Sequence, residues 1–286
     1  MKKLKQIITT VKTSAGVPRD EYDELLWQLI CYSPKMPVRL QQEQLLNEAD
    51  RFSLQVDDEY FAQKQLTFNG FSWGNGSRKI LITHGWGSKA ADFTELISAL
   101  RRLGDLQVIA FDAPGNGSSE GELSNLLLFK QAVKAIITKY GPPDVLIGHS
   151  LGGMANIIAV QDLGIKPALV LSLTPLIRLK ENFENSMDAA DVPKSSQLRF
   201  LQCFEQKFGI PASYYNLTER YCLDADINHW LAYDKNDLTS TYNFIEEFLN
   251  KYPAVKNQNY EGVGHEKIIK STQVIDDIVS RVKRTD

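Results

Sequence analysis

Hydrophobic residues in the middle of the chain form short, dense runs separated by longer stretches with helical spacing. The short runs lie at residues 80–83, 108–111, 145–147 and 168–173. Continuous apolar runs of this length indicate strands buried on both faces of a parallel sheet. The stretches with helical spacing lie at residues 91–103, 123–140 and 151–163. The alternation of the two patterns predicts an α/β fold.

The segments before this central part have different patterns. Residues 20–50 place leucines at helical spacing and predict outer helices. Residues 52–56 and 66–73 alternate apolar and polar side chains and are flanked by glycine and asparagine, which predicts edge strands. We therefore expect an N-terminal helical extension over residues 1–50 and one α/β domain over residues 51–286.

The alternation of predicted strands and helices ends after Pro175. Residues 176–226 are mixed, polar and helical, and they predict an insertion over the sheet. The alternation resumes with a predicted strand at 227–233, a helix at 241–251 and a strand at 255–260. A last helix places Val274, Ile278 and Val282 on one stripe.

Composition and charge exclude several classes of protein. The chain has 286 residues, 43% of them hydrophobic and 23% charged, which is ordinary globular usage and excludes a disordered or fibrous chain. The formal net charge of −3 does not suit a nucleic-acid binder. Apolar stretches fall short of the ~18 residues that a membrane-spanning helix needs, so no integral membrane association is expected.

The N-terminus and the cysteines indicate where the protein resides. Residues 1–11 contain lysines and a few aliphatic side chains, but no small-residue cleavage site follows, so we expect no secretory signal. Cys31, Cys203 and Cys222 have neither the number nor the spacing of a disulfide framework. A reduced, cytoplasmic location is expected.

The strongest chemical signal is a serine between two glycines at the end of a predicted strand. Gly148-His149-Ser150-Leu151-Gly152 follows the run at 145–147 and opens the next helix. A serine on so sharp a turn is exposed for attack on a carbonyl, and side chains at the glycine positions would collide with neighbouring backbone. We expect Ser150 to be a nucleophile rather than a helix cap.

A nucleophilic serine needs a general base, and the chain has four histidines. On a strand-turn-helix nucleophile, the acid and then the histidine follow the serine in the sequence, which excludes His84 and His149. His229 lies within a predicted strand and is interpreted as a core histidine. His265, in a glycine-containing turn after the last predicted strand, is the expected base.

The carboxylate that orients the histidine should lie in a loop between Ser150 and His265. Asp237, in the loop after the strand at 227–233, is our choice, and Asp234 in the same loop is the alternative. The negative oxygen formed during attack also needs donors. The backbone N–H groups of Trp86, after the strand at 80–83, and of Leu151 are expected to form this oxyanion hole.

Together these motifs resemble the α/β-hydrolase superfamily over about residues 52–284. His84-Gly-Trp-Gly resembles the oxyanion loop, residues 112–119 the turn after the fourth strand, residues 148–153 the nucleophile turn, and Gly264-His265 the terminal histidine loop. The resemblance implies an eight-stranded, mostly parallel sheet flanked by helices, a lid inserted after the sixth strand, and ester-type hydrolysis without a cofactor. Related dehalogenases and epoxide hydrolases carry aspartate where Ser150 stands, which argues against their chemistry.

Three phenylalanines in the predicted insertion share one helical stripe. Phe200, Phe204 and Phe208 could line an acyl pocket, although such a stripe more often packs a helix on its neighbours. Gly115, Gly117 and Gly121 have the wrong spacing for a dinucleotide site. We therefore expect neither a cofactor nor a metal.

The expected reaction is hydrolysis of a carboxylic ester or thioester of a small-molecule acyl substrate through an acyl-enzyme on Ser150. Acyl transfer, peptide hydrolysis and carbon-carbon bond hydrolysis use the same machinery and stay open. A non-catalytic ligand-binding or sensor protein on the same fold is the alternative from another class. The sequence leaves the oligomeric state open.

Overall fold

A computed structural model describes residues 2–14 and 19–284 and contains an eight-stranded sheet within them. The strand order is β1-β2-β4-β3-β5-β6-β7-β8. The strands are β1 (Asp50–Asp58), β2 (Lys64–Trp73), β3 (Arg78–Thr83), β4 (Leu106–Phe111), β5 (Val145–His149), β6 (Leu169–Leu173), β7 (Asn228–Tyr233) and β8 (Lys256–Asn259). Each of the eight corresponds to a strand that the hydrophobic pattern predicts.

The pairing is parallel from β4 through to β8 and antiparallel at the other edge. β2 pairs antiparallel with both β1 and β4, whereas β3 pairs parallel with β4 and β5. β5 to β8 continue in parallel. The carboxyl ends of the parallel strands therefore meet at one edge of the sheet, where ligands bind in open α/β folds.

Helices cover both faces of the sheet. They are α1 (Lys2–Thr13), α2 (Arg19–Cys31), α3 (Leu40–Asn47), α4 (Thr94–Arg101), α5 (Leu126–Tyr140), α6 (Leu151–Leu163), α7 (Leu179–Ala189), α8 (Lys194–Phe208), α9 (Leu217–Arg220), α10 (Tyr242–Lys251) and α11 (Thr272–Lys283). Three short 3-10 turns are η1 (Ala90–Phe93), η2 (Ala212–Tyr214) and η3 (Ile268–Lys270). In the described part of the chain, no helix has the length and apolar character needed to cross a bilayer.

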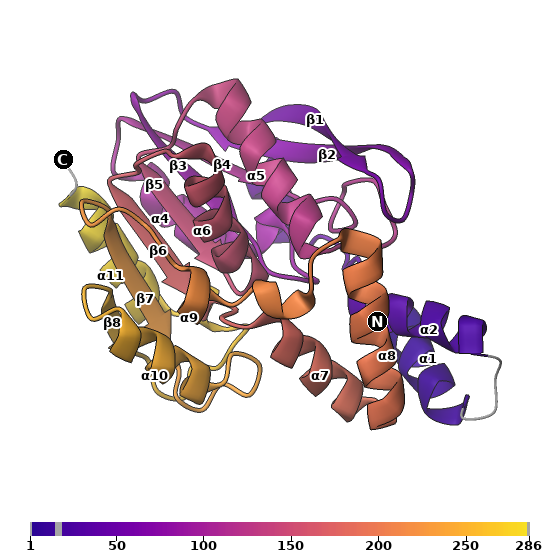
Figure 1. Cartoon of the computed structure of the whole chain (residues 1–286). Coiled ribbons are helices and arrows are strands. Elements are labelled where there is room, and N and C mark those ends of the chain that lie inside the picture. Colours follow the sequence, from indigo (N-terminus) through magenta and orange to yellow (C-terminus); the bar gives the residue numbers. More distant parts are fainter. Residues whose placement is uncertain (1, 15–18, 285–286) are drawn as a thin grey trace.

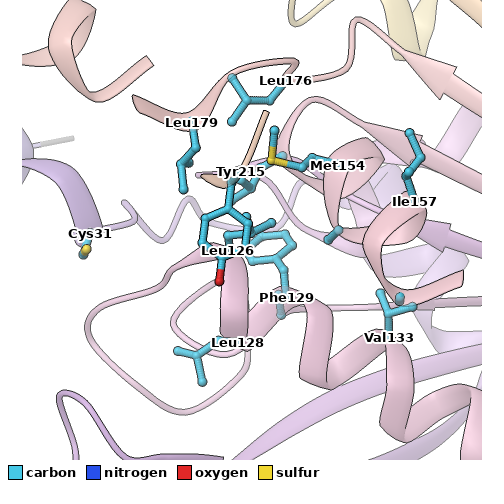
Figure 2. Packing of buried hydrophobic residues seen from close by; sticks show 14 of the residues in the cluster. Cys31, Leu126, Leu128, Phe129, Val133, Met154, Ile157, Leu176, Leu179 and Tyr215 are labelled. Atoms are coloured by element: carbon cyan, nitrogen blue, oxygen red, sulfur yellow. The ribbon is translucent and has the colours of Figure 1, made fainter. Parts of the chain in front are cut away.

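Alternation along the buried strands creates two apolar layers. In β3, Leu81 packs into the layer that contains α5 and α6, and its neighbours Ile80 and Ile82 pack into the layer that contains α4 and α11. Figure 1 shows α5 and α6 lying over one face of the sheet. In Figure 2, Phe129 and Val133 of α5 and Met154 and Ile157 of α6 belong to the first layer.

The residues between β6 and β7 form α7, α8, η2 and α9, in the segment 176–226 that we call the insertion. Helices α7 and α8 contact α2, and α2 contacts α1. Figure 1 shows these four helices, α1, α2, α7 and α8, gathered to one side of the sheet. We call them the four-helix cluster. It joins the N-terminal helices to a segment that follows them by more than 140 residues.

Within the N-terminal extension, helical spacing was identified only from residue 20 onward, but the structure also contains α1 before it, and the sequence explains this helix. Leu4, Ile7, Ile8 and Val11 stand at i, i+3, i+4 and i+7, which gives the helix one apolar stripe. Ile7 and Val11 are buried in the same apolar layer as α5 and α6. The helix expected at 91–103 begins instead as the 3-10 turn η1 and continues as α4.

Candidate active site

Ser150 occupies a strained turn between β5 and α6. Its backbone has φ 52° and ψ −120°, a region that a residue with a side chain adopts only when its surroundings enforce it. Its N–H donates to the carbonyl of Leu173 at the end of β6 (3.0 Å), and its own carbonyl accepts from Leu176 (3.1 Å). The turn is therefore fixed by the neighbouring strand and lifts Ser150 above the sheet edge.

The glycines around Ser150 allow this close packing. A Cβ at Gly152 would lie 2.3 Å from the carbonyl oxygen of His84, and a Cβ at Gly148 would lie 2.6 Å from the Cα of Gly153. At Gly85, a Cβ would lie 3.0 Å from the Cβ of Ser150. The loop after β3, distant in sequence, thus approaches the serine turn as closely as backbone atoms permit.

His265 and Asp237 meet at the same sheet edge. The Nδ1 of His265 donates to Oδ2 of Asp237 at 2.7 Å. The second oxygen of that carboxylate, Oδ1, accepts from the backbone N–H groups of Thr239 (2.7 Å) and Ser240 (3.1 Å). Burial alone would raise the pKa of Asp237, but the His265 hydrogen bond and charge and the two N–H donors outweigh it and lower that pKa. Asp237 therefore stays ionised beside the imidazole.

Asp234, the alternative acid, has other partners. Its Oδ2 accepts from the backbone N–H of Gly264 (2.7 Å) and its Oδ1 from that of Asn236 (2.9 Å). Asp234 thus joins the loop that carries Asp237 to the loop that carries His265. The structure brings Asp237, and not Asp234, to the imidazole.

The loop after β3 packs against Ser150 through its backbone, and the side chain of His84 supports it. Nδ1–H of His84 donates to the carbonyl of Gly85 (2.6 Å), and Nε2 accepts from the N–H of Ala113 (2.9 Å). Burial outweighs the nearby Asp112 and lowers the pKa of His84, so the ring stays neutral. Trp86 follows this fixed histidine, and its indole is partly exposed.

His149, which precedes the serine, also contacts the histidine loop. Its Nε2–H donates to the backbone carbonyl of His265 (3.0 Å), and the two imidazole centroids are 4.9 Å apart. Its Nδ1 has no hydrogen-bond partner among the described residues. Burial, and then the charge of His265, lower the pKa of His149 to about 3. The order of the motif excludes His149 as the base because it precedes Ser150, and no local pattern in the sequence indicates its contact with His265.

His229 is a core histidine, as its place in β7 predicts. The buried ring is hydrogen-bonded at Nε2 to Ser172 Oγ (2.9 Å) and at Nδ1 to the hydroxyl of Tyr221 (3.0 Å). Burial lowers its pKa to about 3. His265 is therefore the histidine in contact with a carboxylate at the sheet edge.

Ser150 and His265 line one cavity of about 820 Å³, which also reaches Trp86 and Leu151. Such a volume lies at the large end of the ~300–1,000 Å³ typical of small-molecule sites. Phe204 and Phe208 line this cavity, whereas Phe200 is not among its lining residues. Phe200 packs behind them against Trp27, at 4.6 Å between ring centroids. The stripe of phenylalanines therefore serves both cavity and core.

Several lining residues were not predicted from the sequence. Leu4 of α1 and Leu29, Ile30 and Cys31 of α2 reach the cavity from the N-terminal segment. Their signal in the sequence is only the apolar stripe of an outer helix, which does not tell whether the stripe faces a core or a cavity.

Solved structures similar to this chain share its fold. An esterase from Pyrococcus furiosus has a TM-score of 0.61 and 17% identity, over 89% of this chain and 97% of that one. A putative hydrolase from Agrobacterium vitis has a TM-score of 0.63 and 12% identity, over 83% of this chain and 98% of that one. At these identities the likeness concerns the fold alone.

Similar sequences cover a shorter part of the chain. Monoglyceride lipases from Rattus norvegicus and Homo sapiens are each 33% identical over 112 residues, which are 36% of this chain and 37% of those proteins. The match thus spans little more than a third of these relatives. The model of the Alpha/beta hydrolase family matches residues 80–253, which is more than half of the chain. The protein therefore belongs to the alpha/beta hydrolase family.

Proposed function

We propose that the protein is a serine hydrolase that cleaves a carboxylic ester or thioester through an acyl-enzyme on Ser150. The observation that carries this proposal is the 2.7 Å contact between Asp237 and His265, with His265 and Ser150 lining the same cavity. A hydroxyl becomes a strong nucleophile when a base beside it is itself oriented by a carboxylate. The esterase and lipase names of similar proteins support the same class of reaction.

In the first step, His265 takes the proton of the Ser150 hydroxyl while its oxygen attacks the substrate carbonyl. The resulting imidazolium is stabilised by the ionised Asp237. The backbone N–H groups of Trp86 and Leu151 receive the negative oxygen, and Leu151 adds the favourable field of a helix N-terminus. Each such donor contributes about 3 kcal/mol to the transition state.

In the second step, the protonated His265 delivers its proton to the leaving alcohol or thiol, which leaves an ester on Ser150. A water molecule then gives a proton to His265 and attacks this ester. The acid product leaves, and the serine recovers its proton. The cycle uses only side chains and backbone of this chain and requires no cofactor.

The insertion acts in this proposal as a lid that shields the acyl group. Leu176, Leu179, Phe204, Phe208 and Tyr215 of the insertion line the cavity together with Ser150. Figure 2 shows Leu176, Leu179 and Tyr215 of the insertion among the buried side chains of the layer that also contains Leu126 of α5. The proposal also places the enzyme in a reducing compartment such as the cytoplasm, in keeping with its three free thiols.

A ligand-binding protein on this fold is the second candidate, and one observation favours hydrolysis over it. A receptor gains nothing from a serine held at φ 52° and ψ −120°, because such backbone strain costs about 1–3 kcal/mol. Strain of this kind at a cavity is typical of a reactive group. Acyl transfer, peptide hydrolysis and carbon-carbon bond cleavage would use the same residues on other substrates.

Covalent labelling tests the proposal. A fluorophosphonate probe should label the wild-type protein on Ser150, and Ser150→Ala should abolish labelling while the thermal unfolding curve stays cooperative. Nitrophenyl esters, acyl-thioesters and a monoacylglycerol should then identify the bond that is cleaved. A wild-type protein that binds acyl ligands but is neither labelled nor active on any of them would establish the binding protein instead.

A further inference from the structure

The N-terminal helices contribute a wall to the cavity that contains Ser150. Leu4 of α1 and Leu29, Ile30 and Cys31 of α2 line it. Each of these side chains is apolar or, for the thiol of Cys31, behaves as a small apolar group. Burial raises the pKa of Cys31 to about 12, so this thiol stays neutral. The N-terminal wall therefore offers no charge to a ligand.

The charged residues of the cavity come from other segments. Arg39, Lys89, Asp92, Glu266 and Lys270 lie between α2 and α3, after β3, and around η3. The walls from α5 and the insertion that accompany the N-terminal wall are mainly apolar, with Leu126, Leu127 and Phe183 among their side chains. A flexible hydrocarbon chain is the ligand that an apolar space of this kind favours.

The N-terminal wall is held in place by contacts with the insertion. Trp27 of α2 lies at ring-centroid distances of 4.6 Å from Phe200 and 6.2 Å from Phe204 of α8. Arg199 of α8 makes a bidentate ion pair with Asp23, with its Nε 2.8 Å and 3.1 Å from the two carboxylate oxygens. Trp27, Phe200, Asp23 and Arg199 are not among the residues that line the cavity, so these side chains fix the helices without occupying the space for a ligand.

We infer that α1 and α2 form the wall of an acyl-chain subsite, and that Leu4, Leu29 and Ile30 determine the length of acyl chain that Ser150 accepts. This inference rests on the proposed function, since it names the acyl part of the same substrate. The preferred substrates carry a long saturated chain such as dodecanoyl. A methylene buried in an apolar site strengthens binding about fourfold, so a few carbons in contact with this wall have a large effect.

The test compares two tryptophan substitutions on α2. Ile30→Trp places a large ring in the cavity, whereas Leu25→Trp adds the same ring at a half-buried position of the same helix that does not line the cavity. The specificity constant kcat/KM is measured for acetyl, octanoyl, dodecanoyl and hexadecanoyl nitrophenyl esters. In the wild type we expect it to rise at least tenfold from acetyl to octanoyl.

Ile30→Trp should lower the ratio of kcat/KM for the dodecanoyl ester to kcat/KM for the acetyl ester at least tenfold. Leu25→Trp should leave this ratio within twofold. Ile30→Ala enlarges the subsite and should move the optimum toward the hexadecanoyl ester, which keeps the inference testable if the tryptophan variant fails to fold. Chain-length profiles that stay unchanged in the folded Ile30 variants would overturn the inference.

A binding measurement separates this inference from the proposed function. Dodecanoate should displace a fluorescent fatty acid from the Ser150→Ala protein, and adding Ile30→Trp should weaken that displacement at least tenfold. If the wild type hydrolyses no ester of any length, the proposed function fails, and the displacement result still decides whether the N-terminal wall binds an acyl chain. Equal displacement in the two proteins would refute the inference that α1 and α2 contact the acyl chain.

Discussion

Two regions of the molecule meet at the cavity and are built in different ways. The turns at the sheet edge hold Ser150, Asp237 and His265 through short local segments, glycines and backbone hydrogen bonds. The four-helix cluster is held by side chains that are distant in sequence, such as Asp23 and Arg199, which are 176 residues apart. The first region fixes the positions of individual polar atoms, and the second fixes the shape of an apolar space.

This difference indicates how the two regions respond to substitution. At the sheet edge, a Cβ at Gly152 would fall on backbone oxygens that cannot turn away. In the cluster, the contacts join side chains such as Trp27 and Phe204 and involve no backbone oxygen. We therefore expect substitutions at the sheet edge to abolish chemistry, and substitutions in the cluster to change substrate preference or stability.

The largest expected effect distinguishes two aspartates of the sheet edge. Asp237→Asn removes the charge that stabilises the imidazolium of His265 and favours the wrong tautomer, so kcat for an acetyl ester should fall about 10⁴-fold. Asp234→Asn should lower kcat less than about tenfold, because Asp234 positions only loop backbone. Steady-state kinetics of the two purified variants measure this, and the reverse ranking would move the acid to Asp234.

A smaller effect is expected from one methyl group at the nucleophile turn. Gly152→Ala should lower the free energy of unfolding by about 1–3 kcal/mol despite the better helix propensity of alanine, because its Cβ would lie 2.3 Å from His84 O and 2.5 Å from Thr83 O. Ser195→Ala, at an exposed position of α8, is the matched change in the cluster and should stay within about 0.5 kcal/mol. Urea denaturation measures both. Equal stabilities would remove the contrast between the regions.

The smallest effect concerns the ion pair that fastens the cluster. A double-mutant cycle of Asp23→Ala and Arg199→Ala should give a coupling free energy of about 0.5–1 kcal/mol, since the pair is bidentate but partly exposed. Activity on the acetyl ester should stay within twofold in all three variants. A large loss of that activity would mean that the cluster also positions the catalytic groups.

The hydrophobic pattern predicted the sheet, for a physical reason. Strands β3 to β7 are buried on both faces, so their apolar runs are visible without knowledge of the partners. The turn at Ser150 needs glycines at fixed positions on both sides. Both glycines fall within the five consecutive residues 148–152, so the sequence alone shows them. The order of residues after the serine selects His265, and it leaves both Asp237 and Asp234 as candidates for the carboxylate.

What the sequence did not reveal depends on tertiary contacts. The hydrogen bond from His149 to the backbone of His265 joins residues 116 apart, and a backbone acceptor leaves no mark in the sequence. Likewise, Leu29 and Ile30 have the same apolar character as the core residues of their helix. The positions of α7 and α8 determine whether such a stripe faces a cavity or a neighbouring helix. The residues of the stripe do not reveal those positions.

The long separation between Asp23 and Arg199 has a consequence for biosynthesis. Helices α1 and α2 leave the ribosome before α8, whose aromatic surface covers Trp27 and is made more than 160 residues after α2. At typical elongation rates of about 5–20 residues per second, the apolar stripes of the nascent helices stay uncovered for about ten seconds or longer. The arrangement that closes the finished cavity thus leaves apolar helix surfaces exposed while the rest of the chain is made.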